Sequence, residues 1–126
     1  MISTVFLVAI GGAIGAVLRF LSGMVMLRLM GPQEFPVAIL SVNVLGSFLM
    51  GVFVVAAAHK GLTHLNPLVM TGLLGGFTTF SAFSLETVTL MERGDIGAAG
   101  LYVGLSVGLS VFGLMLGLWL ARGVFL

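Results

Sequence analysis

The chain of 126 residues lacks cysteine and carries few charged side chains. Without cysteine, disulfides, thiolate chemistry and cysteine-containing metal sites are all excluded. Asp, Glu, Lys and Arg make up only 7% of the residues, whereas a soluble domain usually carries about 25% because its surface must face water. The net charge of +1 leaves no basic surface for nucleic acid. The composition therefore excludes both a soluble globule and a nucleic-acid-binding protein.

The residues that are present are mostly apolar. Hydrophobic residues account for 60% of the chain, and the mean hydropathy is +1.28. Nineteen glycines lie among leucine, valine, phenylalanine and alanine, a setting in which glycine allows close packing of helices inside a bilayer. Gly11 and Gly15 have the four-residue spacing of such a contact. These features indicate an integral membrane protein.

The positions of charges and turn residues divide the chain into membrane-spanning segments. A helix that crosses about 30 Å of hydrocarbon needs roughly 20 mostly apolar residues. Three stretches interrupt the apolar sequence, at residues 28–36, 59–67 and 92–95. The apolar segments that remain are long enough to span, at about 3–29, 36–58, 67–91 and 96–121. We therefore predict an all-α membrane protein with four transmembrane helices in one domain, residues 1–126.

Lys and Arg are shared almost evenly between the two sides of the membrane. Cytoplasmic loops normally collect these residues. Here one side holds Lys60 and Arg122, and the other holds Arg28 and Arg93. This balance predicts insertion in both orientations, so that opposite-facing copies pair about a twofold axis in the membrane plane. The alternative is a topology signal that the insertion machinery reads and that charge alone does not reveal.

Asn43 is a polar residue in the middle of the second predicted helix. It shares one helix face with Ser47 and Gly51, at positions i, i+4 and i+8. A buried amide needs partners for its carbonyl and for both N–H groups. Asn43 must therefore face another helix or a wet cavity rather than lipid. Both interpretations, a hydrogen bond between helices and a place in a polar cavity, stay open at this point.

The fourth predicted helix carries two stripes with a four-residue repeat. Hydroxyl groups recur at Tyr102, Ser106 and Ser110. Glycines recur at Gly100, Gly104 and Gly108. Because two residues turn a helix by about 200°, the stripes lie on nearly opposite faces. We expect the glycine face to admit a close neighbouring helix and the other face to present hydroxyls in a row.

Two charged residues lie within the predicted spans. Arg19 is in the first helix, and Glu86 is near the end of the third. A charged side chain at the bilayer centre costs several kcal/mol, whereas one near a helix end reaches the headgroups. We interpret both residues as lining an aqueous vestibule. No Lys or Arg precedes Arg19, and therefore we expect no cleaved signal peptide.

The third predicted helix contains a stretch that is a poor helix interior. Gly75 and Gly76 are followed closely by the β-branched Thr78 and Thr79. We therefore predict a break in this helix. Unwound backbone at this depth must be satisfied by protein, water or an ion. In transporters such breaks direct carbonyl groups at a cation and helix N-termini at an anion.

Two aromatic residues follow the predicted break. Phe80 and Phe83 stand three residues apart and share a helix face. An aromatic ring has a positive edge. Two ring edges are therefore able to contact an anion without contributing a charge that would hold it too long. Further hydroxyl groups lie close by in the sequence, at Thr79, Ser81 and Ser84.

The run from Gly75 to Glu86, Gly-Gly-x-Thr-Thr-Phe-Ser-x-Phe-Ser-x-Glu, resembles the signature of the Fluc (CrcB-type) fluoride channels. The chain length, the four-helix count and Asn43 in the second helix match as well. This resemblance implies a multi-pass protein of the cell inner (plasma) membrane. It also implies an antiparallel homodimer with two pores that passively exports cytoplasmic fluoride.

The resemblance also implies roles for individual residues. Phe80 and Phe83 match the aromatic box of the pore, and Asn43 matches the pore amide. The polar track corresponds to Tyr102, Ser106 and Ser110. Arg19 matches the vestibule arginine. Gly75 and Thr78 match the residues whose backbone carbonyls, from both subunits, hold a structural Na⁺. One departure is Leu114, where some relatives carry a threonine.

Other functions agree less well with the sequence. A small proton-coupled multidrug exporter also has four short helices and inserts both ways, but it needs an ionisable carboxylate deep in the membrane. The first acidic residue here is Glu34, in a loop. A non-transporting assembly subunit explains the glycine stripes but not a break beside two phenylalanines. An enzyme is not expected, because no carboxylate pair, cysteine or buried histidine is available.

Overall fold

The computed structural model describes residues 1–32 and 34–125; Gln33, part of the first predicted loop, lies outside the described residues. Four apolar helical spans are long enough to cross a membrane: Ile2–Met30, Val37–Lys60, Thr63–Glu92 and Ile96–Phe125. They correspond to the four predicted segments, and the protein is therefore a multi-pass membrane protein. The prediction of four transmembrane helices is confirmed.

The third span is built from several pieces, whereas the other three are single helices. The single helices are α1 (Ile2–Met30), α2 (Val37–Lys60) and α5 (Ile96–Phe125). The pieces of the third span are the 3₁₀ turn η1 (Thr63–Leu65), the π-helical η2 (Pro67–Leu74), α3 (Gly75–Phe77) and α4 (Phe80–Glu92). The second predicted loop is shorter than expected, because α2 continues to Lys60 and η1 begins at Thr63.

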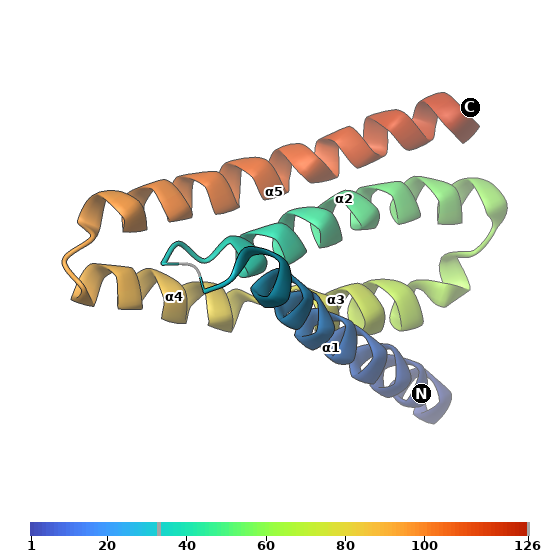
Figure 1. The fold of residues 1–126 in the computed structure, drawn as a ribbon. Coiled ribbons are helices and arrows are strands. Elements are labelled where there is room, and N and C mark those ends of the chain that lie inside the picture. Colours follow the sequence, from blue (N-terminus) through green and yellow to red (C-terminus); the bar gives the residue numbers. More distant parts are fainter. Residues whose placement is uncertain (33, 126) are drawn as a thin grey trace.

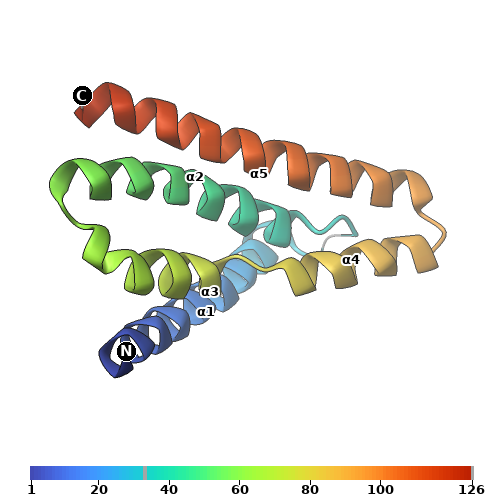
Figure 2. The same ribbon diagram turned by 180° about the vertical axis from the view of Figure 1, so that it is seen from behind.

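The helices lie lengthwise with their connections at two opposite ends (Figures 1 and 2). Both chain termini and the α2–η1 connection lie at one end, and the α4–α5 turn lies at the other. Helix α5 runs beside α2, while α1 crosses the third span obliquely at η2 and α3. The α1–α2 and α4–α5 connections are joined by Arg93, which donates to the backbone carbonyl of Glu34 at 2.8 Å.

Glycines bring α1 and the third span into backbone contact. A Cβ added at Gly11 would meet the carbonyl oxygen of Leu68, and one added at Gly15 would meet that of Leu73. No side chain fits at either position without moving backbone. The close helix contact predicted from the spacing of Gly11 and Gly15 is therefore confirmed.

The close contact of α5 uses other glycines than expected. A Cβ at Gly117 would meet the carbonyl oxygen of Phe48 in α2, and one at Gly51 of α2 would meet that of Leu114. By contrast, a Cβ added to the glycines of the predicted stripe would have no described neighbour within 4 Å. These glycines are Gly100, Gly104 and Gly108. This stripe packs against no described residue of the same chain, because α5 turns a different face towards α2.

The break in the third span is confirmed, but it lies two residues beyond the glycine pair. Gly75 has helical dihedral angles (φ −62°, ψ −38°), and α3 contains both Gly75 and Gly76. The unwound residues are Thr78 (φ −87°, ψ 161°) and Thr79 (φ −152°, ψ 126°). The extended conformation suits β-branched threonine. The poor helix formers were thus identified correctly as a group, but the threonines, rather than the glycines, leave the helix.

Candidate functional site

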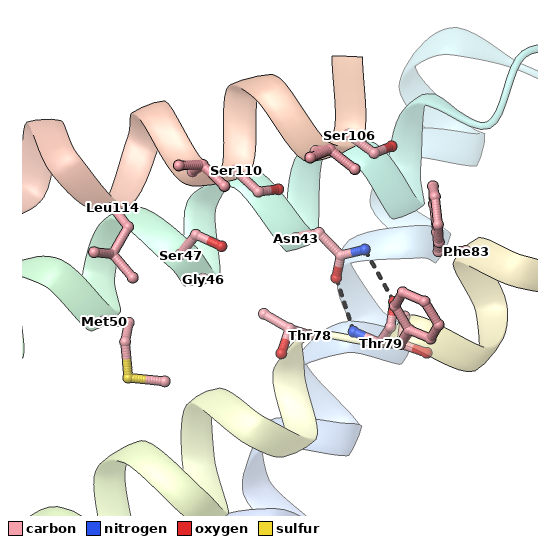
Figure 3. A pocket seen from close by; sticks show the side chains of 13 residues that line it. Asn43, Gly46, Ser47, Met50, Thr78, Thr79, Phe83, Ser106, Ser110 and Leu114 are labelled. Carbon is pink, nitrogen blue, oxygen red and sulfur yellow. Dashed lines mark hydrogen bonds between the residues drawn. The ribbon is translucent and has the colours of Figure 1, made fainter. Parts of the chain in front are cut away.

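The side chain of Asn43, on α2, forms hydrogen bonds with the unwound backbone at the break. Its Oδ1 accepts a hydrogen bond from the backbone N–H of Thr79 at 2.8 Å, and its Nδ2 donates to the carbonyl oxygen of Thr79 at 3.0 Å (Figure 3). The amide therefore pairs with both backbone groups of one unwound residue. This arrangement satisfies backbone that neither lipid nor the helix would satisfy at membrane depth. One N–H of the Asn43 amide remains for another acceptor.

The same hydrogen bonds release two carbonyl groups from the helical pattern. In an unbroken helix the N–H of Thr79 would donate to Gly75, and the N–H of Ala82 would donate to Thr78. Here the N–H of Thr79 donates to Asn43, and the N–H of Ala82 donates to the Thr79 hydroxyl at 3.1 Å. The carbonyl oxygens of Gly75 and Thr78 thus lose their helical donors.

Arg19 reaches the break from α1. Its Nε donates to the carbonyl oxygen of Gly76 at 3.2 Å, which also has no helical donor because Phe80 begins a new helix. The side chain is half-buried. The structure therefore places Arg19 beside the unwound backbone, where its positive charge lies close to the end of α3. This contact does not test the predicted role of Arg19 in lining a vestibule, which stays a prediction.

A groove of about 400 Å³ begins at the break and runs between α2, α4 and α5 (Figure 3). Its polar lining comes from the predicted residues Asn43, Thr78, Thr79, Ser106 and Ser110 and from Ser47. Its apolar lining comes from Gly46, Met50, Phe80, Phe83, Val107, Val111 and Leu114. None of the described residues that line this groove has an ionisable side chain, so an ion within it meets dipoles and ring edges rather than a fixed charge.

An aromatic cluster borders the groove at the α4 side. The rings of Phe80 and Phe83 are 5.4 Å apart, and those of Phe83 and Tyr102 are 5.2 Å apart. Phe35 contacts Tyr102 edge to face at 5.6 Å. Phe83 is therefore held between two rings. Phe80 is 77% exposed, so the groove in a single chain is open on the side where this ring lies.

Two buried hydroxyls lie without partners beside this cluster. Tyr102 is fully buried and Ser106 nearly so, and neither hydroxyl has a hydrogen bond within the described ranges. A buried hydroxyl without a partner costs free energy, and such groups in native proteins commonly serve a bound water, ion or ligand. Both lie one helical turn apart on α5. They extend the polar lining from the groove to the space behind Phe83.

Not all predicted site residues line the groove. Tyr102 lies behind Phe83 and packs with Leu90 and Ala99. The hydroxyl of Ser81 is 3.3 Å from that of Thr79, and the hydroxyl of Ser84 donates to the carbonyl of Phe80 at 3.0 Å. Both serines are thus occupied locally, outside the groove.

Glu86 lies in a separate cavity. This cavity has a volume of about 190 Å³, and Phe35, Pro36 and Met26 also line it, beneath the α1–α2 connection. The position is near one end of the helices rather than beside the break. The vestibule role expected for Glu86 stays a prediction.

The groove is also lined by residues that were not predicted as site residues. Ser47 shares a helix face with Asn43 by its four-residue spacing, so its presence in the groove was visible in the sequence. Met50, Val107 and Val111 give no such signal, because apolar residues on a transmembrane helix also face lipid. Only the packing of α2 against α5 selects them.

The chemistry of this groove suits a small anion. Amide and hydroxyl groups donate hydrogen bonds, and aromatic edges are positive. No group of three or more His, Asp or Glu side chains gathers anywhere in residues 1–32 and 34–125, so a metal centre built from such side chains is absent there. A cation would have only carbonyl and hydroxyl oxygens as ligands.

Comparison with known proteins agrees with this reading. A family model described as CrcB-like protein, Camphor Resistance (CrcB), matches residues 6–118. A protein of Roseobacter denitrificans called fluoride-specific ion channel FluC is 73% identical over 124 residues, which cover 98% of each chain. A protein of Ruegeria sp. with the same name is 67% identical over the same coverage. From the family match and these identities, the chain belongs to the CrcB family.

Proposed function

We propose that this protein is a fluoride-specific ion channel of the plasma membrane that lets cytoplasmic fluoride leave passively. The observation that carries the proposal is the uncharged groove at the break in the third span. Fluoride is small and strongly hydrated, so a pore must replace its water shell with hydrogen-bond donors. Conduction also requires binding that is favourable enough for entry and weak enough for exit. A lining of amide, hydroxyl and ring-edge groups meets both requirements. The names of the relatives agree with this proposal.

The proposed pore requires a second copy of the chain. In one chain the groove is open, and Phe80 is largely exposed beside it. A Cβ added at Gly100, Gly104 or Gly108 would also meet no described residue within 4 Å. An antiparallel homodimer would cover the open side and let each copy complete the groove. Lys and Arg occur evenly at both ends, which agrees with insertion in both orientations.

A structural Na⁺ is part of the proposal. The residues fit such an ion, because the carbonyls of Gly75 and Thr78 have lost their helical donors at the break. Unwound carbonyls of this kind coordinate Na⁺ in membrane transporters. One chain supplies two such oxygens, so a site shared by two copies would supply four. When bound, the cation raises the local electrostatic potential that an anion meets.

Fluoride release from liposomes tests the proposed function. Purified protein is reconstituted into liposomes loaded with potassium fluoride, and a fluoride electrode records release after a potassium ionophore is added. We expect rapid release without a proton gradient, because no groove residue carries a proton that transport would exchange. Release that requires a proton gradient would instead favour the proton-coupled exporter, and no release would contradict a channel.

Removal of sodium tests the proposed cation. We expect replacement of Na⁺ by a larger organic cation on both sides of the membrane to lower the thermal unfolding midpoint in detergent and to slow fluoride release. The reason is that four carbonyl dipoles would face one another without a charge to hold them. Returning Na⁺ serves as the control and should restore both quantities. An unfolding midpoint that is independent of Na⁺ would contradict a cation bound at Gly75 and Thr78.

A further inference from the structure

Two classes of hydroxyl group on the helices differ in their hydrogen bonds. In the first class the hydroxyl donates to the carbonyl four residues earlier, at distances of 2.8 to 3.0 Å, as in Thr78, Ser84, Thr87 and Thr89. This is the ordinary way in which a hydroxyl is satisfied inside a membrane. In the second class the hydroxyl forms no hydrogen bond among the described residues and lines the groove, as in Ser47, Ser106 and Ser110.

Ser47 belongs to the second class although it lies on a different helix from the other two. It is half-buried on α2, one turn after Asn43, and its hydroxyl points into the groove (Figure 3). Asn43 and Ser47 are four residues apart and share one face of α2, with a rise of about 6 Å between them along the helix axis. Two free donors thus follow one another along α2.

The row of hydroxyl donors on α5 ends at Ser110, and Ser47 of α2 lines the same groove. The four-residue repeat of hydroxyls reaches Ser110, and the next position of the repeat is Leu114. Leu114 and Met50 make the far end of the groove apolar. Ser47 lies between Asn43 and this apolar end in Figure 3, on α2 near Ser110 of α5. Beyond Ser110, the remaining hydroxyl in the groove lining is that of Ser47.

We infer that Ser47 is a further fluoride-coordinating residue and that the row of donors crosses from α5 to α2 beyond Ser110. The inference rests on the proposed function. A hydroxyl that forms no bond with its own helix is able to rotate and donate to an anion without breaking another bond. Because no existing hydrogen bond is lost, binding an anion to this hydroxyl costs little free energy. The hydroxyl also gives a small anion a partner that Leu114 does not provide.

The experiment compares two serine substitutions on the same helix. Ser47→Ala removes the hydroxyl from the groove, whereas Ser41→Ala removes one from the outer face of α2, where it lines other cavities between α2 and its neighbours. We expect Ser47→Ala to lower fluoride release from liposomes about tenfold and to raise the fluoride concentration that gives half-maximal release, because one charge-assisted hydrogen bond is lost. Ser41→Ala should match the unsubstituted protein.

A second variant keeps the test decisive if alanine harms folding. Ser47→Cys has a similar shape and a much weaker donor, and it should also lower fluoride release while leaving the thermal unfolding midpoint unchanged. Release at the unsubstituted rate by either folded variant would overturn the role of Ser47 and leave the proposed function intact. Absence of release from the unsubstituted protein would instead contradict the proposed function itself.

Discussion

Asn43→Ala is expected to abolish fluoride release. The amide forms two hydrogen bonds with the backbone of Thr79, and it is the only side chain among the described residues that contacts both of these backbone groups. Its loss leaves an N–H and a carbonyl unpaired at membrane depth, at a cost of about 1–3 kcal/mol for each group. The third span would then either become helical through Thr78 and Thr79 or lose stability. Either change removes the groove. We expect a fall of at least about 100-fold in the liposome assay.

One measurement and one control variant separate the loss of this hydrogen-bond pair from a general loss of folding. Hydrogen exchange at the Thr79 amide should change in Asn43→Ala, because the acceptor of that amide is gone. Ser41→Ala on the same helix serves as the matched control, since Ser41 is not among the residues that line the groove. A folded Asn43→Ala protein that still releases fluoride at the unsubstituted rate would contradict the role assigned to this amide.

Substitution of either phenylalanine by isoleucine is expected to stop fluoride release nearly completely. Phe83 lies between Phe80 and Tyr102, and both Phe80 and Phe83 line the groove. Isoleucine fills much of the space but has no ring, so the positive edge that faces an anion is lost. The proposed dimer should persist, because isoleucine keeps an apolar surface at both positions. Size-exclusion chromatography in detergent would verify the unchanged assembly.

The matched control for the rings is Phe112→Ile. Phe112 lies on α5, is 59% exposed, and lines an outer cavity rather than the groove. It should therefore tolerate isoleucine without a change in fluoride release. If Phe80→Ile or Phe83→Ile behaved like Phe112→Ile, the rings would not line the ion path.

Much of the fold was predictable because membranes impose strong rules on sequence. The length of each apolar run predicts a span, and the spacing of Gly11 and Gly15 predicts a backbone contact that the structure contains. The break was predictable as a region, since glycine and threonine are weak helix formers. Its position at Thr78 and Thr79 was not, because a hydrogen bond from another helix, that of Asn43, decides which residues unwind.

The site was predictable in its residue types but not in its arrangement. Asn43 was left with two interpretations, and it satisfies both: it bonds the third span and also lines the groove. Ser84 points its hydroxyl at the carbonyl of Phe80 and does not line the groove, and Tyr102 is buried behind Phe83. These outcomes depend on rotamers and on helix rotation, which spacing alone does not define. A Cβ added at Gly104 has no described neighbour within 4 Å, so the contact predicted for the glycine stripe is not made within the described chain.

The central claim is that uncharged donors beside an unwound stretch of helix replace the water shell of fluoride. Its most direct test measures fluoride and chloride release from the same liposomes, with electrodes for both ions and a potassium ionophore to carry the counter-charge. The account predicts fast release of fluoride and release of chloride at the background rate of protein-free liposomes, because a groove of small donors and close rings suits the smaller ion. Chloride release at a rate comparable to that of fluoride would contradict it.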